Sequence, residues 1–174
     1  NDILTLIYKQ LPQSSLLVFC DIGKISQIGN EHLQKQYLDE TIKNKFSKTP
    51  SIFLLESRHD DCLTYIAFII VSNTLAIISS RPFCNKDSFF THNRYTRDFL
   101  KPFINIMTPS HYHIVKELAA SLISCLEPNP IIILRGSPPD LNFQSSIAFF
   151  IENISSEVTK VGVASTIKLE SIVK

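Results

Sequence analysis

The stretch CLTYIAFIIVSNTLAIISS, residues 62–80, decides the fold of this chain. It contains the most apolar run of the sequence, it is rich in β-branched residues, and Ser72-Asn73-Thr74 interrupts it near the middle. A helix that spans a membrane needs about 20 consecutive apolar residues, and this interruption breaks the run. We therefore predict no membrane span but two buried strands joined by a tight turn, with the hairpin at the centre of a sheet.

Apolar periodicity on both sides of this hairpin predicts helices and further strands. Upstream, we expect a helix at 2–11, a strand at 15–20, a loop at 21–30, a helix at 32–46 and a strand at 51–57. Downstream, we expect a helix at 94–106 interrupted near Pro102, a helix at 110–126 with Ser110 as N-cap, a strand at 131–134 and a helix from about residue 142. This order predicts one α/β domain over residues 1–174, with a central mixed sheet flanked by helices. Because the first residue is Asn, we expect the chain to be an excerpt of a longer one.

Composition narrows the classes of function. The chain has 174 residues, 17 Lys and Arg against 16 Asp and Glu, and a net charge of +1, which disfavours a nucleic-acid partner. The cysteines are Cys20, Cys62, Cys84 and Cys125, and all but Cys84 lie among apolar residues. We expect four free thiols, mainly buried, in a reducing intracellular compartment such as the cytoplasm or nucleus. No CxxC pair is present, and we expect neither a metal nor a cofactor.

The segment NFQSSIAFFIENI, residues 142–154, places small polar residues directly before an apolar helix. Gln144-Ser145-Ser146 is suitable N-cap material, because a serine hydroxyl can accept a hydrogen bond from an otherwise unpaired amide of the first turn. We predict that Ser145 caps this helix, with Ser146 as the rival for the same role. The alternative is that Ser145 occupies a catalytic position.

That alternative comes from a family resemblance. A strand, a hairpin, a variable segment, a long helix, a short strand, a proline-containing loop and a final buried helix resemble, in this order, the ubiquitin-like-protein proteases, which are CE-clan cysteine peptidases. In that family the catalytic Cys opens the last helix after an aromatic residue, and a loop glutamine supports the oxyanion. The resemblance implies that Phe143 is the aromatic, that Ser145 replaces the Cys, and that Pro139 replaces the glutamine.

The family's other catalytic positions are changed as well. The resemblance places the catalytic His at Cys62 and the acid at Ser79, and neither side chain can perform that chemistry. His59 is a possible substitute base if the strand begins earlier, with Asp60, Asp61 or Glu56 to orient it.

The resemblance therefore implies a catalytically degenerate domain that binds a protein, such as ubiquitin or a ubiquitin-like modifier. One alternative is a divergent cysteine protease, deubiquitinase or acyltransferase of the same clan. Another is an unrelated α/β scaffold subunit of a larger complex. His111 and His113 form an HxH pattern that chelates metal on a strand, but at a helix start we expect the two rings to point apart.

Overall fold

The computed structural model describes residues 2–10, 16–45, 51–59, 61–81, 89–92, 97–137 and 142–154. Its centre is a six-stranded mixed sheet with the strand order β1-β2-β3-β4-β6-β5. The strands are β1 (Leu16–Asp21), β2 (Ser51–His59), β3 (Cys62–Val71), β4 (Thr74–Ser79), β5 (Phe89–His92) and β6 (Ile131–Gly136). β1 runs parallel to β2 and β4 runs parallel to β6, whereas the other neighbours are antiparallel.

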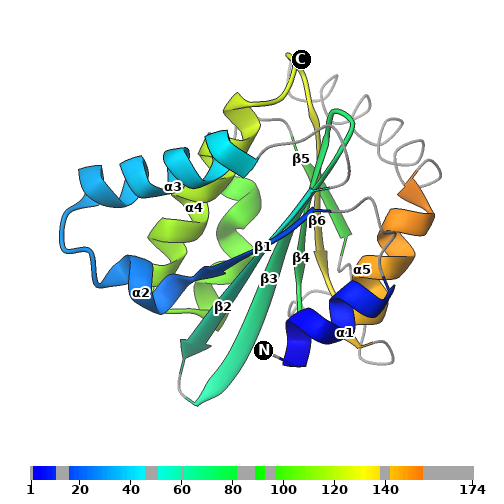
Figure 1. Ribbon diagram of the computed structural model, residues 1–174, viewed down its shortest axis with the longest axis horizontal. Helices are drawn as coiled ribbons and strands as arrows, with labels where there is room; N and C mark the ends of the chain where they lie inside the picture. The colour runs from blue at the N-terminus through cyan, green and yellow to red at the C-terminus, as the bar shows by residue number, and fades with distance from the viewer. Residues whose placement is uncertain are drawn as a thin grey trace.

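Helices cover both faces of the sheet, so that the described elements form three layers (Figure 1). One face carries α1 (Asp2–Gln10) and α5 (Phe143–Glu152). The other carries α2 (Ile22–Ser26), α3 (Glu31–Lys45), α4 (Pro109–Ser124) and the 3₁₀ helix η1 (Arg97–Ile106). The predicted central mixed sheet flanked by helices is therefore confirmed. None of the helices in the described segments is long and apolar enough to cross a membrane.

The hairpin of β3 and β4 lies in the middle of the sheet, as predicted. Its turn is made by Ser72, which has a φ of 54°, and Asn73. The Asn73 carbonyl accepts a hydrogen bond from the Ile131 amide at 3.0 Å, and its side-chain oxygen accepts one from the Glu127 amide at 2.9 Å. The turn thereby holds the connection between α4 and β6, which explains how one polar interruption positions the next strand.

Strand alternation divides the apolar residues into two cores. On β3, for example, Phe68 faces α2, α3 and α4, whereas Ala67 and Ile69 face α1 and α5. Both faces are buried, which is why these strands read as continuous apolar runs rather than as alternating ones. The largest fully buried side chains are those of Phe53, Phe68, Phe103 and Phe150.

The central strands β2 and β3 are longer than their neighbours. β1 pairs with β2 only as far as Glu56, and β4 pairs with β3 only from Ile66. Residues 57–59 and 62–64 therefore continue as a two-stranded ribbon beyond both neighbouring strands (Figure 1). We call this segment the β2–β3 ribbon.

Three predictions about individual elements were wrong. The helix expected at 94–106 with an interruption near Pro102 is, within the described residues, the 3₁₀ helix η1, which continues through Pro102 to Ile106. The loop expected at 21–30 contains the short helix α2, because Ile22 and Ile25 are both buried in the core. The N-cap of α4 is Thr108 rather than Ser110: the Thr108 hydroxyl accepts a hydrogen bond from the His111 amide at 3.3 Å, and Pro109 takes the first helical position. Proline is favoured there, because that amide has no partner inside the helix.

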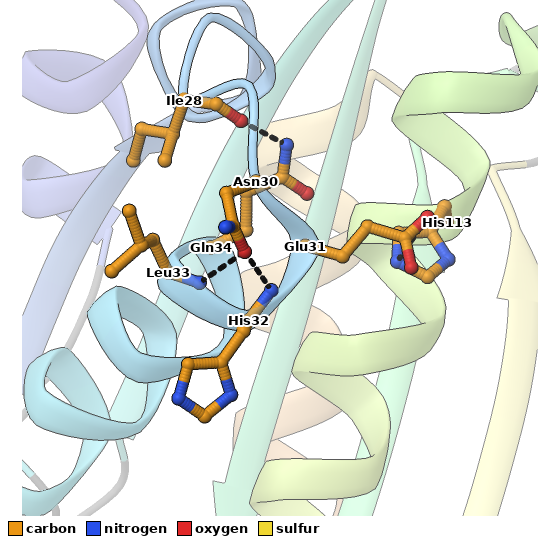
Figure 2. A network of polar contacts seen from close by, with 7 residues as sticks. All are labelled: Ile28, Asn30, Glu31, His32, Leu33, Gln34 and His113. Carbon is orange, nitrogen blue, oxygen red and sulfur yellow. Dashed lines mark hydrogen bonds and ion pairs between the residues drawn. The ribbon is translucent and has the colours of Figure 1, made fainter.

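The start of α3 is fixed by polar contacts (Figure 2). Asn30 is its cap, with a side-chain oxygen that accepts hydrogen bonds from the amides of His32 at 2.9 Å and Leu33 at 3.4 Å. Glu31 reaches towards α4, where His113 Nε2 lies 3.9 Å from its carboxylate. Leu33 points away from this contact and is 50% exposed.

Candidate functional site

Cys62 and Ser79, the positions that the resemblance assigns to base and acid, lie on the same face of the sheet. Along β3, Phe68 and Ile66 belong to the core under α4, and alternation places Cys62 on their side. Along β4, Ile77 belongs to the same core, and alternation places Ser79 on the same side of the sheet as Ile77. Both therefore occupy the α4 face.

The two residues differ in their surroundings. Cys62 is exposed at the start of the β2–β3 ribbon, where it pairs with His59 of β2. Ser79 is fully buried, and its hydroxyl accepts a hydrogen bond from the Arg81 amide at 3.2 Å. The Ser79 carbonyl accepts two hydrogen bonds at 2.9 Å, from the amide and the hydroxyl of Ser137. Ser79 thus has a structural role in joining β4 to the end of β6.

Ser145 belongs to the opposite face. It lies in the first turn of α5, and the buried side of this helix packs into the other core through Ile147 and Phe150. A nucleophile, base and acid act together only when their side chains converge. The sheet instead separates Ser145 from the face to which Cys62 and Ser79 point.

The predicted capping role of Ser145 is wrong. The N-cap of α5 is Asn142, whose side-chain oxygen accepts a hydrogen bond from the Ser145 amide at 2.8 Å. The rival, Ser146, donates its hydroxyl to the Asn142 carbonyl at 3.1 Å and is 5% exposed. The helix begins one turn earlier than the serines suggested, because Asn142 has the extended backbone of an N-cap and Phe143 is already helical and buried.

Phe143 joins the start of α5 to the sheet. Its ring stacks on that of Tyr65 in β3, with 6.0 Å between the ring centroids and an interplanar angle of 18°. Burial raises the pKa of the Tyr65 phenol, and the Glu56 carboxylate, which accepts a hydrogen bond from the phenol, raises this pKa further, while Arg58 opposes the shift. Because the pKa of Tyr65 is higher in the folded chain than in the unfolded chain, the protonated phenol favours the folded state, and this effect is fully present below about pH 10. The effect is lost as the pH rises through the folded-state pKa of Tyr65.

The side of the β2–β3 ribbon that faces α5 is partly open. Arg58 and Leu63 lie directly opposite each other in the ladder, Arg58 is exposed, and Leu63 is 36% exposed. Alternation places them on the same face as Glu56 and Tyr65. A cation, an apolar side chain and the first turn of α5 therefore lie along one surface, which we call the ribbon surface.

Sequence reasoning missed a serine–histidine pair on the other face. Ser57 Oγ lies 2.7 Å from Nδ1 of His111 in the first turn of α4. His113, two residues further on, contacts Glu31 of α3 instead, so the two rings point apart as predicted. Among the described residues, no group of three or more His, Cys, Asp and Glu side chains could hold a metal ion. The alternation of β2 places Ser57 on the α4 face, but no sequence pattern pairs it with a residue 54 positions away.

A Ser–His hydrogen bond is the geometry in which a histidine activates a nucleophile. Here Ser57 is only 2% exposed, and the adjacent Thr64 is fully buried. This burial argues against the use of Ser57 Oγ as a nucleophile. The pair instead anchors the start of α4 to β2.

His59, the possible substitute base, ends β2 opposite Cys62, and Asp61 follows with a φ of 61°. The side chain of His59, together with Asp60 and Pro139, lies outside the described residues. Of the orienting candidates, Glu56 hydrogen-bonds Tyr65 on the α5 face.

The expectation of mainly buried thiols is wrong for Cys62 and Cys125, which are free and exposed. Cys62 is the first residue of β3, and Cys125 is the C-cap of α4. Both are exposed because the ends of strands and helices are less covered by neighbouring elements than their middles. The side chains of Cys20 and Cys84 lie outside the described residues.

We therefore expect at least two thiols of the native protein to react rapidly with Ellman's reagent. Cys62→Ser and Cys125→Ser should each remove one of them, because each exposed thiol reacts independently. Absorbance of the released thiolate, before and after unfolding in denaturant, measures the count. Fewer than two thiols reacting before unfolding contradicts the exposure of these residues.

Comparisons of the chain with protein-family models, with curated proteins and with solved structures find no match.

Proposed function

We propose that this domain is a protein-binding module without peptidase activity. The observation that carries the proposal is the separation of Ser145 from Cys62 and Ser79 by the sheet. A serine without an adjacent base is a weak nucleophile at neutral pH. The separation of these three positions therefore supports the proposal that the domain has no peptidase activity.

The ribbon surface is the binding site in this proposal. It lies beside the first turn of α5, and in the ubiquitin-like-protein proteases the corresponding region receives the tail of the modifier. Arg58 offers a cation to a carboxylate, and Leu63 offers an apolar contact. We propose that the domain shares the fold of these proteases and binds the same kind of partner. Ubiquitin or a ubiquitin-like modifier is therefore the first partner to test. The free thiols of Cys62 and Cys125 are consistent with a reducing, intracellular location.

A hydrolase is the second candidate, and the Ser57–His111 pair is the observation that favours it. It ranks lower because Ser57 is buried. Labelling by a fluorophosphonate probe distinguishes the two candidates: modification that disappears in Ser57→Ala supports the hydrolase, and an unlabelled protein supports the binding module.

We expect ubiquitin or a ubiquitin-like modifier to bind the domain without being cleaved. Arg58→Glu and Leu63→Asp should each weaken binding about tenfold or more, since one reverses a charge at the surface and the other removes an apolar contact. Titration by biolayer interferometry measures the affinities, and electrophoresis of modifier chains and tail fusions reports cleavage.

Leu33→Asp is the matched control, because Leu33 is an exposed leucine on α3, on the other side of the sheet. Loss of binding in Leu33→Asp, with Arg58→Glu and Leu63→Asp unaffected, rejects the ribbon surface. Cleavage that depends on Ser145 or His59 rejects the non-catalytic assignment.

A further inference from the structure

Among the described strands, β1 forms one edge of the sheet. β1 pairs with β2 along its whole length, from Leu16 to Asp21, and is the last strand in the sheet order (Figure 1). Within the described part of the chain, no strand pairs with its other side. In a parallel edge strand, alternate residues direct their amide and carbonyl groups away from the sheet, so β1 presents a row of hydrogen-bonding groups suited to another strand.

Within its own six residues, β1 also lacks the sequence features that protect edge strands. Native edges are commonly protected by lysine, proline, a bulge or a very short strand. The sequence LLVFCD contains no lysine, proline or glycine, and its six residues pair with β2 without a bulge. Phe19, near its middle, is 37% exposed. The opposite edge of the sheet, β5, has only four residues.

We propose that two copies of this chain associate through their β1 edges, antiparallel and related by a two-fold axis, so that the two sheets become continuous. This inference concerns a surface different from the ribbon surface. Opposed residues that share hydrogen bonds must both direct their backbone groups outward, so one central residue, Val18 or Phe19, lies opposite the same residue of the second copy. The two-fold axis lies midway between these two equivalent residues.

The charge on β1 favours this antiparallel arrangement. Asp21 is the only charged residue of the strand and lies at its end. With Phe19 paired with itself across the axis, Asp21 lies opposite Leu17 of the second copy, and the two Asp21 positions are about 13 Å apart along the strands, four residues at about 3.3 Å each. This distance exceeds the screening length of about 8 Å in physiological salt. A parallel pairing in register sets the two Asp21 positions side by side, and like charges on adjacent strands disfavour it.

Light scattering coupled to size-exclusion chromatography, over a range of protein concentrations, tests the proposal. A six-residue ladder is a small interface, so we expect a reversible dimer whose fraction rises with concentration. Phe19→Lys places on the edge the residue that natural sheets use against pairing, and it should raise the dissociation constant about tenfold or more. Phe149→Lys is the matched control, since Phe149 is 46% exposed on α5, and it should leave the dimer unchanged.

Hydrogen exchange of the wild-type chain provides a second measurement that needs no variant. Amides of β1 should become better protected as the concentration rises, while those of α3 should not. A wild-type chain that stays monomeric up to millimolar concentration overturns the proposal and leaves the edge to a strand of another protein. Equal dimerisation of Phe19→Lys and wild type also overturns it. Neither result bears on binding of a modifier at the ribbon surface.

Discussion

Replacing Phe150 with alanine lowers the free energy of unfolding by about 3–5 kcal/mol, the usual cost of removing a fully buried phenylalanine. Phe150 is 0% exposed and packs among the residues between α5 and the sheet. The loss combines the transfer energy of the ring with the cavity that it leaves, since close-packed surroundings collapse only in part. Urea unfolding followed by circular dichroism measures the change.

Phe149 is the control that the chain itself provides. It is the preceding residue on the same helix, but it is 46% exposed, so Phe149→Ala should cost much less than Phe150→Ala. Similar losses for the two variants contradict the orientation of α5. Because α5 carries Ser145, that result also removes the argument that the sheet separates Ser145 from Cys62 and Ser79.

Asn142→Ala should destabilise the domain by about 1 kcal/mol, with a range of about 0.5–2 kcal/mol for the loss of such a cap. The reason is the hydrogen bond that the Asn142 side chain accepts from the Ser145 amide, which has no partner inside the helix. Ser145→Ala leaves that amide and its acceptor in place, so we expect a change of only a few tenths of a kcal/mol. Thermal and urea unfolding of both variants measure the difference.

Asn142→Asp completes the experiment, because aspartate is an equally good N-cap and its charge is favourable at a helix N-terminus. It should retain or exceed wild-type stability. If Ser145→Ala costs as much as Asn142→Ala, the hydroxyl of Ser145 has a role that the hydrogen bonds of Asn142 do not explain.

Strong local patterns predicted the main elements correctly. The run from Cys62 to Ser80 formed β3 and β4 around the polar turn, and the periodicity of residues 110–126 gave α4 within two residues at each end. Such patterns are reliable because a strand that is buried on both faces needs a continuous apolar run, and a helix that is buried along one stripe needs apolar residues at helical spacing. The weak element was α2, which has only five residues and two buried isoleucines.

Capping was predicted less well than the elements themselves. Ser110 and Ser145 are good capping residues by type, yet Thr108 and Asn142 take the role in α4 and α5. Several residues near each start can supply a suitable oxygen, so residue type alone does not choose between them. The choice follows from which neighbour the core buries: Phe143 packs on Tyr65 and thereby starts α5 one turn before Ser146.

The sequence by itself determined the composition of the core, the central hairpin and the alternation of helices with strands, because these follow from hydrophobic periods within one segment. Only the tertiary structure decided which face each helix covers. It placed α5 opposite the face of Cys62 and Ser79, brought His111 to Ser57, and left β1 at an edge. These arrangements depend on the order of the strands in the sheet and on contacts between residues far apart in the chain. The pattern of side chains within one segment does not specify which distant segment it contacts.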